Sequence, residues 1–211
     1  MRTINVLKLD RSNYKNVLSA IEWLSFPVFE ISISEIFDLE DGSTLIIPGI
    51  GHISGLCEQI DKEIQTNVLR ELIRSKNLYV IGICLGFHFL CGSTEEDSSA
   101  DCLGLFPLAI KQLHNNCVPE VGWKKVRRPI GLTKKPNLFT QENDCFYFSH
   151  SFGSEDVAEN AYYYGVGERS IMAFYRQDRI VGMQFHPEKS GSSGLKTFRA
   201  VLLANTLTKL A

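Results

Sequence analysis

Residues 78–86 read Leu78-Tyr79-Val80-Ile81-Gly82-Ile83-Cys84-Leu85-Gly86, and this stretch decides the fold of the chain. The apolar run predicts a buried strand, and two glycines flank Cys84 in the pattern Gly-x-Cys-x-Gly. Because a Cβ at either glycine would crowd the backbone, the pattern predicts a sharp turn from strand to helix. Turns of this kind present nucleophilic serines in other enzymes. Cys84 is therefore the candidate nucleophile.

A second motif reads Gln184-Phe185-His186-Pro187-Glu188-Lys189-Ser190-Gly191. A histidine and a carboxylate two residues apart can serve as the base and the orienting group for a thiol nucleophile. We expect His186 to carry the proton and Glu188 to hold the imidazole in the right tautomer. An oxyanion site needs backbone N–H donors. The candidates are Leu85 and the glycine-rich segment Gly49-Ile50-Gly51, which follows Pro48.

Each motif has a simpler explanation when it stands alone. Cys84 would be a core cysteine, His186-Pro187-Glu188 a surface turn, and Pro48-Gly49-Ile50-Gly51 a turn after a strand. All three, however, follow expected strands. Their joint occurrence favours acyl transfer from an amide, which needs a nucleophile, a proton shuttle and an oxyanion site.

Strands and helices alternate in the first half of the chain, and this order predicts an α/β fold. The expected strands are Ile4–Leu9, Val28–Ile31, Leu45–Ile47 and Leu78–Ile83, and the expected helices are Asn13–Leu24, Ile53–Arg74 and one opening at Leu85–Cys91. The second half is richer in strands, at Phe146–Phe148, Ala161–Tyr164, Ile171–Tyr175 and Ile180–Phe185, before a closing helix at Gly194–Leu207. The polar segment 93–101 is expected to be a surface loop. We expect one domain over 1–211: a three-layer sandwich with a mostly parallel central sheet, helices on both faces and ligands at the carboxyl ends of its strands.

The composition of the chain is that of an ordinary globular protein and argues against several classes of partner and cofactor. The chain is 44% hydrophobic and 22% charged, with a formal net charge of -2, which gives no case for nucleic acid or an anionic membrane surface as a partner. Its basic cluster, residues 124–128, is either a solvated face or a contact for an acidic surface or a phosphate. The six cysteines form neither a disulfide framework nor a metal knuckle. We therefore expect a cytoplasmic protein without a membrane span, a metal or an organic cofactor.

The chain resembles the class I glutamine amidotransferases, whose triad is Cys-His-Glu. It is most similar to the glutaminase subunits of imidazole glycerol phosphate synthase, over nearly its whole length. The segments that carry this finer resemblance are Val118-Pro119 with Gly122-Trp123, Tyr147–Phe152, Lys189-Ser190-Gly191, Gly194-Leu195, and Leu103-Gly104-Leu105 after Glu95-Glu96. The resemblance implies that Cys84, His186 and Glu188 hydrolyse glutamine through a γ-glutamyl thioester. Ammonia would then pass to a barrel-type synthase or cyclase subunit in a heterodimer that serves histidine biosynthesis.

The resemblance also assigns the other site residues. Pro48–Gly51 would flip a peptide to complete the oxyanion hole. The residues that would hold glutamine are His88, Glu96, Ser151 and Phe152. Trp123 would lie near the partner interface.

Three features depart from the family pattern. His88 stands where the family has a glutamine that holds the substrate, so it either donates a hydrogen bond there or merely packs or binds water. The N-terminal segment Leu9–Tyr14 lacks the two glycines of the family motif, and Lys124 stands in place of an asparagine. These changes favour an alternative, a paralogue that supplies ammonia for amidation of a surface-polysaccharide sugar. Two further alternatives are a non-catalytic scaffold subunit, against which the presence of Cys84, His186 and Glu188 counts, and a stand-alone γ-glutamyl hydrolase.

Overall fold

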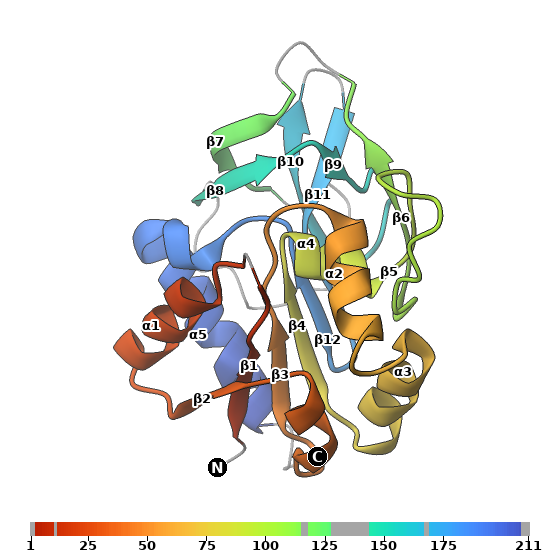
Figure 1. The fold of residues 1–211 in the computed structure, drawn as a ribbon. Coiled ribbons are helices and arrows are strands. Elements are labelled where there is room, and N and C mark those ends of the chain that lie inside the picture. The colour runs from red at the N-terminus through yellow and green to blue at the C-terminus, as the bar shows by residue number, and fades with distance from the viewer. Residues whose placement is uncertain (1–2, 11, 115–117, 128–143, 167–168, 208–211) are drawn as a thin grey trace.

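The structure of the chain is a computed structural model that describes residues 3–10, 12–114, 118–127, 144–166 and 169–207. Within these residues a seven-stranded sheet forms the centre of the molecule (Figure 1). Its strands, in spatial order, are β10 (Ala161–Val166), β11 (Arg169–Gln177), β12 (Ile180–Met183), β4 (Tyr79–Ile83), β3 (Thr44–Ile47), β1 (Ile4–Leu7) and β2 (Val28–Ile31). From β12 to β2 the neighbours pair in parallel, while β11 pairs antiparallel with both β12 and β10.

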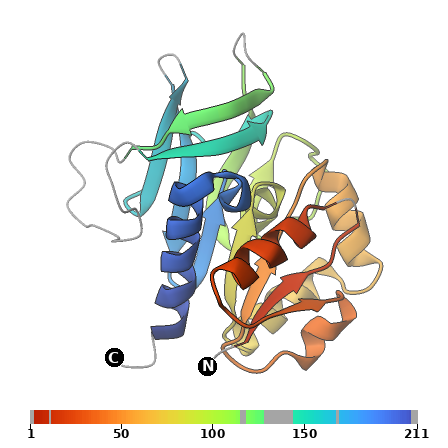
Figure 2. The same ribbon diagram turned by 90° about the vertical axis from the view of Figure 1, so that its left-hand side faces the viewer.

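Helices cover both faces of this sheet. They are α1 (Tyr14–Trp23), α2 (Ile53–Asp61), α3 (Thr66–Ser75), α4 (Leu85–Leu90) and α5 (Gly191–Leu207), with 3-10 turns η1 (Ser34–Asp38) and η2 (Pro187–Lys189). The helices α1 and α5 pack on one face, and Figure 2 shows both in front of the sheet. The helices α2, α3 and α4 pack on the other face (Figure 1). The strands β1, β3 and β4 are fully buried because each is covered on both sides.

Two small sheets lie beyond the carboxyl ends of the parallel strands (Figures 1 and 2). One contains β5 (Cys91–Thr94), β6 (Phe106–Gln112) and β9 (Phe152–Gly153). The other is an antiparallel ribbon of β7 (Glu120–Lys125) and β8 (Cys145–His150). These two small sheets cover the carboxyl edge of the central sheet, where ligands of parallel sheets usually bind.

The expected α/β architecture, with a mostly parallel sheet and helices on both faces, is confirmed. The expectation of one helix over Ile53–Arg74 is wrong, since α2 ends at Asp61 and α3 begins at Thr66. The carboxylate of Asp61 accepts hydrogen bonds from the backbone N–H and the hydroxyl of Thr66, both at 2.9 Å. These bonds cap the start of α3 and make the break favourable. The segment 93–101 begins in β5 rather than in a loop.

Candidate functional site

Four segments of the chain meet at the carboxyl edge of the parallel strands. They follow β1 (residues 8–10 and 12–13), β3 (48–52), β4 (84–88) and β12 (184–189). Neighbouring parallel strands end at one edge of a sheet, so their following loops converge. The residues singled out from the sequence therefore come together although the chain separates them widely.

Cys84 lies at the turn between β4 and α4. Its backbone has φ 52° and ψ -106°, a left-handed conformation that a side chain with a Cβ rarely adopts. The turn is held by the Cys84 N–H, which donates to the Met183 carbonyl, and by the N–H groups of Phe87 and His88, which donate to the Cys84 carbonyl. Strain of this kind occurs where the surrounding structure fixes a functional residue. The thiol is 6% exposed and lines a pocket.

The glycines around Cys84 allow three backbone segments to pack closely. A Cβ on Gly86 would lie 1.9 Å from the carbonyl oxygen of Ile47 in β3. One on Gly82 would lie 2.5 Å from the carbonyl oxygen of Gly86, and one on Gly49 would lie 2.7 Å from the Cβ of Leu85. The Gly-x-Cys-x-Gly pattern is therefore required by the fit of the turn against the neighbouring strand and loop.

His186 and Glu188 form a buried pair beside Cys84. The Nδ1 atom of His186 donates to Glu188 Oε1 at 2.9 Å, and the two side chains are 1% and 0% exposed. The backbone of His186 is anchored on both sides. Its N–H donates to the Tyr147 carbonyl at 3.0 Å, and its carbonyl accepts from the Ser190 hydroxyl at 2.6 Å. The imidazole is thus held in one orientation, with Nε2 left for a second partner.

Cys84 lies close enough to this imidazole to act on its pKa. Burial lowers the pKa of His186, but the charge and hydrogen bond of Cys84, together with those of Glu188, outweigh it and raise the pKa to about 10. A histidine with this pKa is an imidazolium near neutral pH. An imidazolium beside a cysteine is the pairing that enzymes use to supply both a nucleophile and a proton donor.

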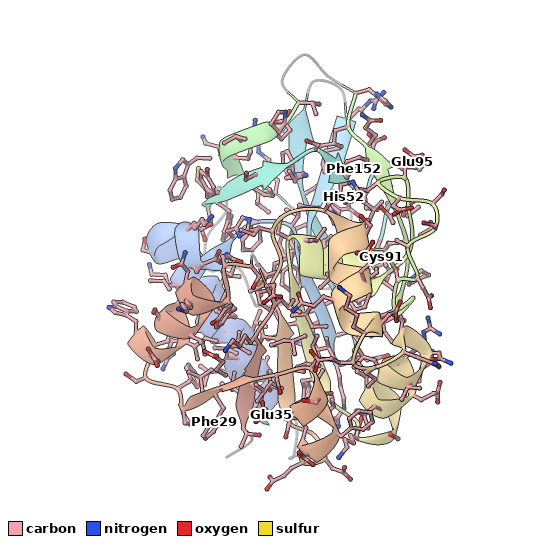
Figure 3. The ribbon with its side chains drawn as sticks, in the orientation of Figure 1. Phe29, Glu35, His52, Cys91, Glu95 and Phe152 are labelled. Carbon is pink, nitrogen blue, oxygen red and sulfur yellow. The ribbon has the colours of Figure 1, made fainter. Side chains whose placement is uncertain are left out.

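A pocket of about 460 Å³ opens in front of these groups. It is lined by Ile50, Gly51, His52, Cys84, Leu85, His88, Glu96, Pro119, Ser149, His150, Ser151, Phe152, His186 and Lys189. Figure 3 labels two of these residues, His52, which precedes α2, and Phe152, which lies in β9. Of the expected oxyanion residues, Ile50, Gly51 and Leu85 line the pocket, whereas Gly49 lines a neighbouring pocket of about 510 Å³.

His88 lies behind the thiol and also faces the pocket. Its Nε2 donates to Gln184 Oε1 at 2.8 Å, and Gln184 Nε2 lies 3.8 Å from Cys84 Sγ. This bond leaves Nδ1 of a neutral His88 as an acceptor. Nδ1 is buried, has no hydrogen-bond partner among the described residues, and lies 3.9 Å from Glu96 Oε2. Two acceptors that face each other at this distance form a site for an N–H donor.

Glu96 provides negative charge in the same pocket. Its side chain is 5% exposed, accepts from the Ile53 N–H at 3.1 Å, and lies 3.7 Å from Nε2 of His52. A buried carboxylate is costly unless it is paired or hydrogen-bonded. Glu96 therefore suits a ligand that carries an ammonium group.

His150 fixes the segment that contains Ser151 and Phe152. Its Nδ1 donates to the Phe152 carbonyl at 2.7 Å, and its Nε2 accepts from the Tyr164 hydroxyl at 2.9 Å. Burial lowers the pKa of His150 to about 3, with smaller contributions from His88, His186 and Lys124. His150 is thus a neutral structural group.

Trp123 lies outside the pocket on the β7–β8 ribbon. It is 57% exposed and stacks edge-on against Tyr147, with ring centroids 6.2 Å apart. Val121, two residues earlier on the same face of β7, is 54% exposed. Lys124 pairs with the buried carboxylate of Glu120 at 2.6 Å, so one member of the expected basic cluster serves an internal ion pair. Arg128 lies outside the described residues.

Sequence reasoning missed one residue of the site. Asn13, which precedes α1, places its side-chain amide against Glu188 and His186. No local pattern marks it, because its partners lie 175 and 173 residues away. Gln184 was part of a quoted motif, but nothing in its spacing indicated that it bridges His88 and Cys84.

Neither a metal centre nor a membrane span is found in the described part of the chain. No group of three or more His, Cys, Asp or Glu side chains there could hold a metal ion. No helix among the described residues is long and apolar enough to cross a membrane.

Comparisons of the sequence with known proteins agree on one family. The model of the family "Glutamine amidotransferase class-I" matches residues 10–206. The imidazole glycerol phosphate synthase subunit HisH of Staphylococcus aureus (strain Mu50 / ATCC 700699) is 32% identical over 191 residues, which cover 90% of this chain and 91% of the relative. The imidazole glycerol phosphate synthase hisHF of Emericella nidulans is 30% identical over 217 residues, covering 96% of this chain and 38% of the longer relative.

Solved structures show the same fold. A crystal structure of a glutamine amidotransferase matches with a TM-score of 0.72 at 15% identity, covering 97% of this chain and 100% of the other. The structure of PurLQS from Thermotoga maritima matches with a TM-score of 0.67 at 17% identity, covering 96% and 98% of the two chains.

Proposed function

Because the chain belongs to the class I glutamine amidotransferases, we propose that it hydrolyses glutamine to glutamate and ammonia and passes the ammonia to a synthase subunit. The observation that carries the proposal is that Cys84 and His186 line one pocket while Glu188 is hydrogen-bonded to His186. A thiolate paired with an imidazolium is the chemistry that amide hydrolysis through a covalent intermediate requires. The chain acts as one glutamine amidotransferase domain, in the cytoplasm, without a metal or an organic cofactor.

In the first half of the reaction the Cys84 thiolate attacks the side-chain carbonyl carbon of glutamine. The carbonyl oxygen takes up the negative charge and is stabilised by backbone N–H groups of Leu85 and of the Gly49–Gly51 segment. Leu85 suits this role, since the first N–H groups of a helix have no acceptor within it. His186 gives its proton to the departing nitrogen, the C–N bond breaks, and ammonia leaves a γ-glutamyl thioester on Cys84.

In the second half a water molecule replaces ammonia. Neutral His186 takes a proton from the water, which attacks the thioester carbonyl, and the C–S bond breaks to release glutamate. Cys84 returns as a thiolate beside the imidazolium. Glu188 stabilises the imidazolium in both halves of the cycle and keeps Nε2 directed at the reacting atoms.

The pocket also accounts for recognition of an α-amino acid. The ammonium group of glutamine would lie between Nδ1 of His88 and the carboxylate of Glu96, and so satisfy both acceptors. Ser151 and Phe152 line the same pocket and would hold the rest of the amino-acid backbone. His88 then binds as an acceptor, in the place where the family has a glutamine.

Replacing His88 with phenylalanine should raise the KM for glutamine about tenfold, which corresponds to the loss of one hydrogen bond to a charged group. Phenylalanine keeps the buried ring and removes both nitrogens. Steady-state kinetics of glutamate release would separate KM from kcat. A fall in kcat at constant KM would show instead that His88 serves the thiol through Gln184.

We further propose that the partner is a barrel-type synthase subunit that makes imidazole glycerol phosphate in histidine biosynthesis. Similarity to HisH over 90% of the chain supports this partner. Its test is glutamate release from glutamine, measured with the chain alone and with a candidate barrel subunit that has bound the imidazole-glycerol-phosphate precursor. Strong stimulation by that pair is expected. If glutamate release is measurable but the pair does not stimulate it, the glutaminase proposal stands. The ammonia acceptor would then be another molecule, such as a sugar.

Trp123→Ala should weaken binding of the barrel subunit about thirtyfold, because a large exposed aromatic at an interface commonly contributes about 2 kcal/mol. Trp123 and Val121 form an exposed apolar face beside the pocket, and faces of this kind are enriched at the centre of interfaces. Titration calorimetry would measure the affinity. Trp23→Ala is the matched control, since Trp23 is 71% exposed at the end of α1. If the Trp123→Ala and Trp23→Ala variants bind the barrel subunit with equal affinity, Trp123 is not part of the interface.

A further inference from the structure

Asn13 occupies the position that begins α1, yet its side chain does not serve that helix. An asparagine at an N-cap ordinarily accepts a hydrogen bond from the N–H of the second or third helical residue. Here the side chain makes no capping bond, and only the backbone carbonyl of Asn13 accepts from Asn16 and Val17, at 3.0 and 3.3 Å. The side chain is 8% exposed and turned toward the loop after β12. The buried amide therefore makes its hydrogen bonds outside the helix that it precedes.

The side chain of Asn13 contacts Glu188 and His186, the two residues beside Cys84. The Nδ2 group of Asn13 donates a hydrogen bond to Glu188 Oε1, and Nδ2 lies 3.4 Å from Nδ1 of His186. Glu188 Oε1 therefore accepts from two donors, the amide of Asn13 and the imidazole of His186. Three side chains meet at one oxygen atom.

The direction of this bond follows from the chemistry of the three groups. If the amide of Asn13 were turned over, its oxygen would face the carboxylate oxygen of Glu188, and two acceptors would be forced together. The orientation with Nδ2 toward Glu188 is therefore the favourable one. A carboxylate held by two donors has little freedom to rotate away from the imidazole, and hydrogen bonds to a charged group are among the stronger ones.

We propose that Asn13 is a positioning residue, which holds the Glu188 carboxylate against His186 and so keeps the imidazole aligned with Cys84. It does not touch the thiol or the pocket, and its action passes through Glu188. The inference rests on the proposed function of the Cys84 site and adds a fourth residue, from the other end of the chain, to its support. Partners of this kind set ligand orientation in many sites, and a misplacement of about 1 Å in an active site can lower the rate about a hundredfold.

Two substitutions separate positioning from a merely structural role. Asn13→Ala removes the amide. Asn13→Asp keeps the shape of the side chain and is an equally good N-cap, but an ionised aspartate cannot donate to Glu188 and repels its carboxylate. We expect both variants to lose between about tenfold and a hundredfold in kcat, with KM for glutamine changed by less than about twofold. Asn16→Ala, at an exposed asparagine on the same helix, is the matched control and should behave as the wild type.

A second readout does not depend on glutamine turnover. The rate at which iodoacetamide alkylates Cys84 at neutral pH, followed by mass spectrometry of the peptide that contains it, reports the thiolate fraction. Asn13→Ala should alkylate at least about tenfold more slowly than wild type and Asn16→Ala, because a misaligned imidazolium stabilises the thiolate less.

The outcomes distinguish the two proposals. If the wild type releases no glutamate, the proposed function fails, while the alkylation rates still decide the role of Asn13. Wild-type alkylation of Asn13→Ala overturns the inference. So does an Asn13→Asp variant with wild-type kcat, because shape and capping alone would then suffice. Thermal melting of each variant checks that it is folded, and a misfolded alanine variant leaves the decision to the aspartate variant.

Discussion

Replacing Cys84 with alanine should lower the rate of glutamate release at least about 10⁴-fold, the scale seen when the nucleophile of a covalent mechanism is removed. The loss has a direct physical reason, because no other thiol lines the pocket among the described residues. Alanine has a Cβ like cysteine, so the left-handed backbone at position 84 is equally strained in both proteins. The melting temperature should therefore stay near that of wild type. A coupled assay for glutamate measures the rate.

Cys145→Ala is the control for this variant. Cys145 is half-buried on β8 and does not line the pocket, so its replacement should leave the rate within about twofold of wild type. Substantial hydrolysis by Cys84→Ala would contradict the covalent mechanism and point to direct attack by water. Loss of activity in both variants would show that replacing either cysteine unfolds the protein. The assay would then report loss of folded protein and not loss of the nucleophile.

Gly86→Ala should destabilise the protein by about 3 kcal/mol or more, at the upper end of the cost of overpacking a core. The added Cβ would lie 1.9 Å from the Ile47 carbonyl oxygen, which is a backbone atom of a buried central strand. A flexible side chain could move aside, but here β3 or the turn itself must shift. Urea unfolding followed by circular dichroism would give the free energy of unfolding.

Gly55→Ala is the matched control in the same measurement. Gly55 lies within α2, and a Cβ there would meet nothing within 4 Å. Alanine also has the higher helix propensity, so this variant should be as stable as wild type or more stable by up to about 1 kcal/mol. Equal stability of Gly86→Ala and Gly55→Ala would show that the turn after β4 tolerates a larger separation from β3.

Much of the fold followed from local patterns. The β4 run was recognisable because a strand buried on both faces is mainly apolar, and the same holds for β1 and β3, which each contain one polar residue. The strands β6 and β7 were not predicted. In β7 the buried residue is Glu120, while Val121 and Trp123 are exposed, so the usual relation between polarity and burial is reversed. A strand that buries a charged residue and exposes apolar ones lacks the usual pattern of apolar inward and polar outward residues, so it could not be recognised from the sequence.

The candidate site was predicted in part. Cys84, His186 and Glu188 were singled out because glycines and a proline mark their turns. Cys84 and His186 line one pocket and Glu188 is hydrogen-bonded to His186, while their catalytic roles stay a prediction. The contact of Asn13 with Glu188 and the bridge from His88 through Gln184 were not foreseeable. Such contacts depend on side-chain directions across a sheet, which become defined only when the strands have paired.

The contact between Asn13 and Glu188 joins positions 175 residues apart, and the contact between Cys84 and Gln184 spans 100. A chain that emerges from the ribosome therefore holds no complete site until its last strand and η2 have left the exit tunnel. Closing loops of this length costs entropy before any contact compensates it, which slows folding. The Cys84 site would be among the last features to form during synthesis, so an incomplete chain would lack it.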